Sequence, residues 1–433
     1  MARRYWGRIR KYLHQLARRL FNFLPRQQKF AVYRTFVVCD PAPSERLQLK
    51  IAETQEELEA CFSLLHDAYV GSGFMKPDPS GMRVTIYHAL PTTTTLCAKW
   101  DGKVVGTLSL IRDSALGFPL QSIFDLTDVI RQEGAIAEVS ALAVHKDFRK
   151  TGGSILFPLM KFMYEYCTAF FDTRHLVIAV NPSHIEMYES LLFFRRLTAN
   201  PVANYDFVNG APAVGATLDL RQAPAIFRDA YDKKPPSRNL FAYFTNVRLR
   251  NIQLPHRRFH ITNDPVLTPE IINTLFNVKT KVFANLGERQ KAILHAIYNL
   301  PQYKAVLPPI SEDSERIALR QHDRFSIRCP GKLAYRDERD VKHVIELEVA
   351  QVSAQGFQAK TREKVPLNVW LTAAINLGIN EVSRIRVMAL HDLGKTGYGF
   401  KIDQPDRTWR VFVAALYHGS THGDMDEASR FLL

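Results

Sequence analysis

The chain of 433 residues is 46% hydrophobic and 23% charged, which is enough for two or three domains with buried cores. Its formal net charge of +14 favours acidic partners such as nucleotides, anionic lipid or an acidic protein. The five cysteines include no Cys-x-x-Cys pair, the histidines are dispersed, and no apolar run is long enough to cross a bilayer. These features argue against a disulfide scaffold, a metal site and a membrane span, so we expect a cytoplasmic protein.

Residues 1–40 form a first, basic segment that contains no acidic residue before Asp40. Apolar residues recur at helical spacing from Trp6 to Leu20, which predicts an amphipathic helix that ends near Pro25. Charges interrupt every apolar stretch, so the segment is a poor secretory signal. Two roles stay open: residues 1–24 dock on a neighbouring domain with a solvated basic face, or they bind an acidic partner or the anionic inner face of the membrane.

Residues 41–220 change to an α/β pattern. Residues 47–53 predict a strand, and Thr54 begins the next helix with Glu57 as its capping-box partner. Residues 71–91 are rich in Gly, Pro and Ser, which predicts a mobile loop. Further strands are expected in a hairpin that turns at Asp101-Gly102, and at 176–180 and 213–220.

The stretch Ala137–Ser154 combines a buried strand, a basic turn and the start of a helix. Glycines let the backbone of the turn approach a ligand, and the first amides of a helix are unpaired, so this arrangement suits an anion. The turn therefore predicts a phosphate or pyrophosphate site, formed by Arg149, Gly152, Gly153 and Ser154.

Two motifs in this stretch carry a family resemblance. Arg149-x-x-Gly152-x-Ser154 resembles the phosphate loop of the GCN5-related N-acetyltransferase (GNAT) fold. The run Glu138–Val144, EVSALAV, resembles the matching strand of acyl-homoserine-lactone synthases and of FeeM-type N-acyl amino acid synthases. Ala141 stands where the lactone synthases carry Arg, so we favour the N-acyl amino acid branch. Residues 181–192 also resemble the family, although Phe193 stands where Gly is usual.

The resemblance implies a GNAT-like fold and an acyl thioester on a phosphopantetheine arm as donor. Glu138 would accept the proton of the attacking amine, Ser140 would position the acceptor, and Tyr188 would protonate the leaving thiolate. A bulge or splay in the strand would free backbone groups to bind the pantetheine and the thioester oxygen. The donor-binding residues would be Leu142, Val144, Arg149, Gly152, Gly153 and Ser154. In relatives, the region of residues 71–91 helps to form the acceptor and acyl-chain pocket.

Each candidate also has a purely structural interpretation. Glu138 could form a simple ion pair, Ser140 could be a small packing residue, and Tyr188 could be a core aromatic residue. His184 could serve as a base or merely begin a helix. The positive charge of the chain favours an acidic acyl carrier protein over coenzyme A as the donor.

Residues 221–310 predict a helical connector, with a helix start at Thr268-Pro269-Glu270. The basic run from Arg248 to Arg258 is expected to be a solvated face rather than a nucleic-acid site.

Residues 311–420 predict a small antiparallel β-barrel, followed by a tail at 421–433. A first motif, Arg320-x-x-x-Arg324, and a second motif about thirty residues later, Gln351-x-Ser353-x-x-Gly356, resemble the paired motifs of PilZ domains, which bind cyclic di-GMP. The resemblance implies that Arg320 and Arg324 bind phosphate and one edge of the guanine. It also implies that Gln351 and Ser353 bind the other edge of the base. Gln351 departs from the usual Asp or Asn, so a barrel that has lost nucleotide affinity stays open. The candidate nucleotide-binding residues are Arg320, Arg324, Gln351, Ser353 and Gly356.

Together these patterns predict a GNAT-like acyltransferase domain, a helical connector and a PilZ-like barrel. The expected activity is transfer of a long-chain acyl group from carrier protein to an amino acid or similar small amine, regulated by cyclic di-GMP. The alternatives are a non-catalytic scaffold that responds to the nucleotide and docks on membranes, and an N-acetyltransferase that uses acetyl-coenzyme A. A deep apolar cleft near Phe118–Phe124 and residues 71–91 would argue against the latter.

Overall fold

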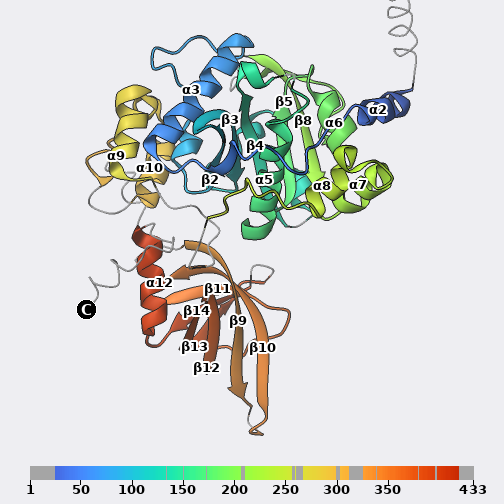
Figure 1. Ribbon diagram of the computed structural model, residues 1–433. Helices are drawn as coiled ribbons and strands as arrows, with labels where there is room; N and C mark the ends of the chain where they lie inside the picture. The colour runs from blue at the N-terminus through green and yellow to red at the C-terminus, as the bar shows by residue number, and fades with distance from the viewer. Residues whose placement is uncertain are drawn as a thin grey trace, which may run out of the picture.

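The computed structural model describes residues 25–311 and 325–418, except 133, 150, 172, 206–209, 256–258, 260–266, 299–302, 338, 379 and 395–396. An α/β domain is followed by a β-barrel, drawn above and below in Figure 1. The fold class predicted from the sequence is thereby confirmed: a GNAT-like mixed α/β domain precedes a small antiparallel barrel. No described helix combines the length and hydropathy that a membrane span needs.

The first domain is built on one mixed sheet with the strand order β1-β2-β3-β4-β5-β8-β6, and β7 pairs with β8. Strands β4 and β5 run parallel, whereas the other described neighbours in this sheet run antiparallel. The strands are β1 (Leu47–Ile51), β2 (Thr93–Trp100), β3 (Lys103–Arg112), β4 (Ala135–Val144), β5 (Thr173–Val180), β6 (Arg195–Arg196), β7 (Val202–Tyr205) and β8 (Ala211–Asp219).

Helices cover both faces of this sheet. One core joins the sheet to α5, α7 and α8, and separate clusters lie under α3 and under the short helix α4 on the other face. The expected helix start at Thr54 is present, because its hydroxyl accepts the Glu57 N–H at 3.2 Å. The helices of this part are α2 (Arg26–Thr35), α3 (Gln55–Gly71), α4 (Thr127–Ile130), α5 (Leu156–Phe171), α6 (Ile185–Leu192), α7 (Ala223–Tyr231) and α8 (Leu240–Thr245).

Strand β4 is irregular in its second half. Its pairing with β5 ends at Glu138, opposite Val177, although both strands continue. Its register with β3 shifts between Thr107 and Ser109, and Ala141 has a left-handed φ of 53°. The sheet therefore splays between β4 and β5 just beyond Glu138, and a bulge at Ala141 accompanies the splay.

The region predicted as a helical connector packs on the first domain in two parts. Helices α7 and α8 lie against α5, whereas residues 267–307 cover α3 and the segment Met82–Leu90. Figure 1 draws α9 and α10 beside α3. The second part consists of α9 (Pro269–Ile272), the π-helix η6 (Asn273–Lys279), the 3-10 helix η7 (Val282–Asn285) and α10 (Glu288–Ile297).

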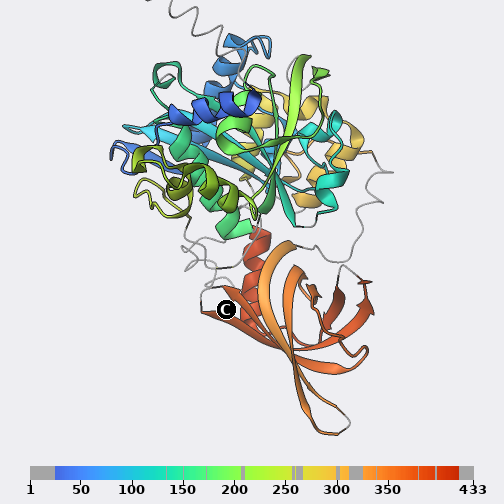
Figure 2. The ribbon, with the colours of Figure 1, turned by 90° about the vertical axis from the view of Figure 1, so that its right-hand side faces the viewer.

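The barrel closes in the order β10-β11-β14-β13-β12-β9. Figure 2 shows the curved strands and α12 (Arg407–His418) alongside them. Trp409 and Phe412 of α12 are fully buried in the barrel core, and the connector residue Phe259 contacts Phe412 with 5.0 Å between ring centroids. The strands are β9 (Phe325–Arg336), β10 (Lys342–Ser353), β11 (Gly356–Lys360), β12 (Trp370–Gly378), β13 (Glu381–Asp392) and β14 (Tyr398–Ile402).

Candidate active site

Glu138 lies on β4 at the point where the sheet splays. Its side chain is buried, with 2% of the residue exposed, and its carboxylate accepts the Leu120 N–H at 3.0 Å. Among the described residues, no basic side chain forms an ion pair with Glu138. The alternative that Glu138 forms a simple ion pair is therefore not supported. Burial therefore raises the pKa of Glu138 to about 8, and the hydrogen bond from Leu120 offsets only part of this rise.

Three tyrosines from separate segments are close enough to Glu138 to respond to its charge. Burial, with the charge of Glu138 as a further cause, raises the pKa values of Tyr69, Tyr87 and Tyr205. The Arg83 guanidinium lies over the Tyr69 ring, 4.3 Å from its centroid. None of these residues was singled out from the sequence, because no local motif joins the end of α3, residues 83–87 and β7.

His88 fixes the segment beside Glu138 to the sheet. Its Nδ1 accepts the Thr85 N–H at 3.0 Å, so the ring proton sits on Nε2, which lies 3.4 Å from the Ser109 hydroxyl. Burial, followed by the positive charge of Arg83, lowers the pKa of His88 to about 3. The ring is therefore neutral at physiological pH. Residues 82–90 were expected within a mobile loop, but Met82, Ile86 and Leu90 are buried in a core cluster.

A cleft of about 430 Å³ runs through the splay between β4 and β5. Tyr69 and Tyr205 line it on the side of Glu138, and His184 lines it at the start of α6. Arg149 lies at the end of the cleft near α5, and its Nε donates to the Val144 carbonyl at 2.8 Å. A cation at one end and a buried carboxyl near the other suit a donor with a phosphate and an acceptor with an amine.

The predicted phosphate turn has the backbone that its glycines require. Gly152 and Gly153 adopt φ values of 69° and 87°, in the left-handed region that favours glycine. A Cβ on Gly153 would lie 2.5 Å from the Phe157 ring, so this glycine also permits close packing. The Ser154 and Thr151 hydroxyls are 2.6 Å apart. The turn leads directly into α5, as the sequence predicted.

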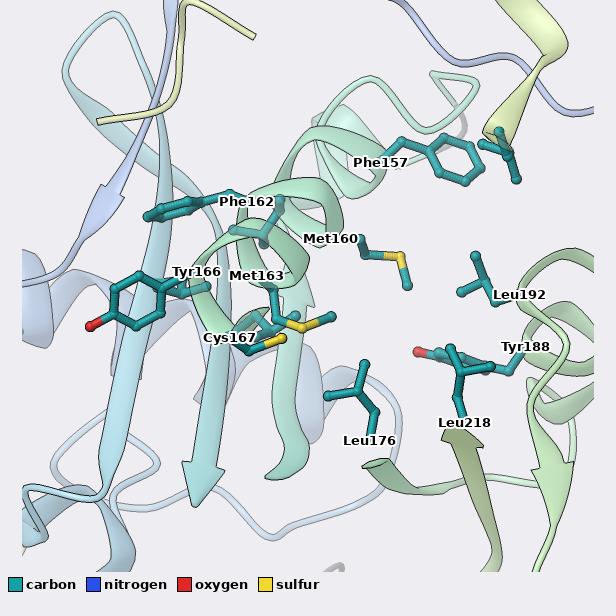
Figure 3. Packing of buried hydrophobic residues seen from close by; sticks show 14 of the residues in the cluster. Phe157, Met160, Phe162, Met163, Tyr166, Cys167, Leu176, Tyr188, Leu192 and Leu218 are labelled. Atoms are coloured by element: carbon teal, nitrogen blue, oxygen red, sulfur yellow. The ribbon is translucent and has the colours of Figure 1, made fainter. Parts of the chain in front are cut away.

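A second, apolar cavity of about 60 Å³ lies on the α5 side of the sheet. Val139 of β4 lines it, whereas its neighbour Glu138 faces the other side. In Figure 3, Met160 and Met163 of α5 face Tyr188 and Leu218 across this region. Phe118 and Phe124, near which a deep apolar cleft would argue against an acetyl-coenzyme A enzyme, are buried in a core cluster on the opposite face.

Tyr188 lines both the cleft and the apolar cavity. Its hydroxyl points toward the α5 side in Figure 3. Burial raises the pKa of Tyr188 to about 12, so the phenol keeps its proton at neutral pH. Its ring also makes an edge contact with Phe194, with 5.8 Å between the centroids. The residue is therefore a core aromatic that also borders the candidate site.

The remaining candidates on β4 are close to the bulge. Leu142 lines the cleft, and Ser140 is half-buried and pairs with Ser109 of β3. The Val144 carbonyl is occupied by Arg149.

In the barrel, the described candidates lie at the end of β10 and the start of β11. The Ser353 hydroxyl donates to the Gly356 carbonyl at 3.1 Å, and the Ser353 carbonyl accepts the Trp409 Nε1–H at 3.2 Å. A Cβ on Gly356 would lie 2.6 Å from the Phe400 carbonyl oxygen. Gln351 is half-buried at a register shift of β10. Arg320 and Arg324 lie outside the described residues.

The splayed GNAT-like sheet, with a buried carboxyl beside the cleft, fits an acyltransferase domain. Residues 60–219 match the family model described as N-acyl amino acid synthase FeeM. This domain is an N-acyl amino acid synthase-like acyltransferase.

The domain is also similar to several solved structures. FeeM, an N-acyl amino acid synthase from uncultured soil microbes, has 23% identity and a TM-score of 0.36, covering 41% of this chain and 93% of FeeM. The coenzyme A-dependent acyl-homoserine lactone synthase BjaI has 21% identity and a TM-score of 0.33, covering 42% and 88%. A GNAT-family acetyltransferase from Streptococcus pneumoniae has 13% identity and a TM-score of 0.29, covering 40% and 98%. No curated protein matches this sequence.

Proposed function

We propose that the first domain transfers a long-chain acyl group from a phosphopantetheine thioester to the amine of an amino acid or similar small amine. The observation that carries this proposal is Glu138, a buried carboxyl without an ion-pair partner among the described residues, whose pKa is raised to about 8. An amine must lose a proton before it attacks, and a base that titrates near the working pH accepts that proton efficiently.

The donor is proposed to lie along the cleft. Arg149 and the amides of the Gly152–Ser154 turn bind its phosphate, and the pantetheine follows the splayed part of β4 past Leu142. The bulge at Ala141 interrupts the pairing with β3, which leaves backbone amides to bond the pantetheine and the thioester oxygen. The acyl tail passes Tyr188, which borders both spaces, and only its last carbons enter the apolar cavity of about 60 Å³.

The reaction follows from these positions. The Glu138 carboxylate takes a proton from the acceptor ammonium, and the freed amine nitrogen attacks the thioester carbon. An N–H of the β4 backbone stabilises the oxyanion, an interaction worth about 3 kcal/mol. The carbon–sulfur bond then breaks, and the Tyr188 phenol donates its proton to the departing thiolate. The second proton of the former ammonium returns to the Tyr188 phenolate, directly or through water, and Glu138 releases its proton to solvent, so the products are the amide, the thiol and one proton. Ser140, half-buried beside the bulge, positions the acceptor.

The formal net charge of +14 suits an acidic acyl carrier protein as the donor. Palmitoyl-carrier protein and palmitoyl-coenzyme A would each be offered with a pool of amino acids, and products would be identified by mass spectrometry. We expect an N-acyl amino acid from wild type, in higher yield with the carrier protein, and loss of product in Glu138→Gln. Absence of product from wild type with both donors would overturn the proposal.

A second function, regulation by cyclic di-GMP, is proposed for the barrel. Its support is a closed six-strand barrel that carries Gln351, Ser353 and Gly356 at one strand–turn–strand junction, together with the arginines of the first motif. Binding of cyclic di-GMP to the full chain would be measured by calorimetry. We expect loss of binding in Arg324→Ala and unchanged binding in Lys332→Ala, a control on the exposed side of β9.

The coupling to catalysis is proposed to pass through residues 267–307. The Tyr298 hydroxyl donates to the Ala89 carbonyl at 2.6 Å, next to His88, so this part of the chain holds the segment that lines the Glu138 site. A nucleotide shifts activity only if it binds two arrangements of this contact with different affinities. Equal acyl-transfer rates without nucleotide and at saturating nucleotide, in a protein that binds it, would exclude the coupling.

A further inference from the structure

The far wall of the apolar cavity is made by residues outside the matched family region. Phe227 of α7 and Phe241, Phe244 and Thr245 of α8 line the cavity, and all of them follow residue 219, where the family match ends. The walls nearer to Tyr188 come from the matched domain, including Met160, Met163, Leu176 and Leu218. The chain thus supplies one end of this cavity from its own extension.

Several bonds hold this extension in place. The Lys161 ammonium, with 1% of the residue exposed, pairs with Glu165 at 2.7 Å and donates to the Phe244 carbonyl at 3.2 Å. The Asn239 side chain caps α8 by accepting the Ala242 N–H at 2.8 Å. In addition, the Tyr231 hydroxyl of α7 donates to the Leu191 carbonyl of α6 at 2.9 Å. Burying the Lys161 charge is favourable only while these partners stay in position, so the position of α8 is strongly fixed.

The aromatic side chains on this wall support one another. The rings of Phe227 and Phe244 meet edge to face at 5.9 Å, and Tyr164 of α5 makes a similar contact with Phe244 at the same distance. In contrast, Met160 and Met163 on the opposite wall have flexible side chains that adapt to a ligand. The cavity therefore has an adaptable wall on α5 and a rigid aromatic end on α7 and α8.

We propose that α7 and α8 set the length of the acyl chain that the enzyme accepts, with Phe241 and Phe244 as the end of the site and Phe227 as its side wall. This inference rests on the proposed function, because the tail enters past Tyr188. A tail that reaches the aromatic end gains apolar contact with each added methylene until the next methylene meets a fixed ring. One methylene in an apolar pocket discriminates between substrates by about 10- to 200-fold.

The test uses the full-length protein with an equimolar mixture of acyl thioesters from octanoyl to stearoyl and a single amino acid acceptor. Phe244→Ala should favour chains longer than the wild-type optimum by about 10-fold or more, and Phe227→Trp should favour shorter ones. Asp229→Ala, an exposed position on α7, is the matched control and should keep the wild-type profile. Phe244→Leu takes the place of Phe244→Ala if the latter does not fold.

A binding measurement separates failure of this inference from failure of the proposed function. Thermal stabilisation by free fatty acids of the same lengths needs no turnover, and its optimum should shift in the same direction in each variant. If wild type forms no product but the fatty-acid length that stabilises the protein best shifts in Phe244→Ala, the proposed reaction is wrong and the length-setting role of α7 and α8 is supported. If product forms and both profiles stay unchanged in folded Phe244→Ala and Phe227→Trp, the length-setting role is wrong.

Discussion

The two faces of the first domain's sheet differ in how they treat polar groups. On the face toward α3, Glu138 and His88 are buried among tyrosines, and burial moves both pKa values away from their usual range. On the face toward α5, apolar side chains from four helices and three strands enclose a cavity without a buried carboxyl in its lining. Buried polar groups cost stability unless they are paired. The polar face therefore lowers the stability of the fold but carries the candidate catalytic groups, whereas burial of apolar side chains on the other face stabilises the fold.

Strand β4 contributes to both faces because successive side chains of a strand point to opposite sides. Glu138 faces the polar side, Val139 faces the cavity, and the bulge at Ala141 changes this alternation just beyond them. Tyr188 lies at the border, where cleft and cavity meet. Four substitutions would test this contrast.

Glu138→Gln should have the largest effect, with opposite signs for activity and stability. Removing a general base lowers kcat by about 10²- to 10⁴-fold, and we expect the upper part of this range because no described carboxyl lines the cleft that could replace Glu138. In wild type, kcat/KM should rise with pH to a plateau above about 8, because the base must be ionised. A Gln side chain still accepts the Leu120 N–H, so the fold should be retained.

The stability of Glu138→Gln depends on pH through the same carboxyl. Its pKa is about 8 in the fold against an ordinary value of 4.5, so the folded wild type binds a proton that the unfolded chain releases between these pH values. Wild type therefore loses stability as pH rises through this window, and the variant does not. We expect the variant to be more stable by about 3 to 5 kcal/mol above pH 8 and equal to wild type below pH 4.5, measured by urea unfolding. A pH-independent difference would refute the assignment.

Leu176→Ala should cost stability on the apolar face and leave the chemistry intact. Leu176 is 2% exposed in the main core, and truncation of such a side chain destabilises by about 2 to 5 kcal/mol. Urea unfolding would measure the loss, and product formation with a short acyl donor should stay within a few-fold of wild type. Ile130→Ala, at a site 55% exposed, is the control and should change stability little. A stable but inactive Leu176→Ala protein would contradict the division between the faces.

Tyr188→Phe should slow departure of the thiolate, the step assigned to Tyr188 at the border between the cleft and the apolar cavity. If the phenol protonates the thiolate, its loss lowers kcat by about 10²-fold with an alkyl thioester. A thiophenyl ester leaves without a proton, so it should restore most of the rate in Tyr188→Phe and none in Glu138→Gln. Equal rate losses with both leaving groups would show that Tyr188 has only a packing role.

Ala141→Gly should have the smallest effect. The left-handed φ of 53° costs alanine about 1 to 2 kcal/mol relative to glycine, whereas loss of its buried methyl group and the greater freedom of glycine in the unfolded chain act in the opposite direction. The free energy of unfolding should therefore change by less than about 1 kcal/mol. Ala143→Gly, on the same strand but without a left-handed φ, is the control, and it should be clearly destabilising. If the free energy of unfolding falls more in Ala141→Gly than in Ala143→Gly, the methyl group of Ala141 stabilises the bulge.

Local patterns in the sequence were sufficient for the fold and for part of the site. The strand, the glycine turn and the helix around Arg149 form as predicted, as does the helix start at Thr54. The small antiparallel barrel is also present, although its strand β12 was not predicted. These features depend on neighbours within a few residues: glycines that adopt positive φ, a hydroxyl that caps the next turn, and alternation that marks a half-buried strand. The match of residues 60–219 to the acyltransferase family agrees with the motif that pointed there.

The environment of the catalytic candidates was decided only by tertiary structure. Segments far from Glu138 in sequence bury it, and this burial raises its pKa, whereas the Leu120 N–H offsets part of the rise. In the same way, the apolar cavity needs α7 and α8 to fold back on α5. The sequence by itself determined which local elements form and where the charged and glycine residues fall along them. Tertiary packing alone decided which groups lose contact with water, because burial depends on every segment that meets at the site rather than on any one of them.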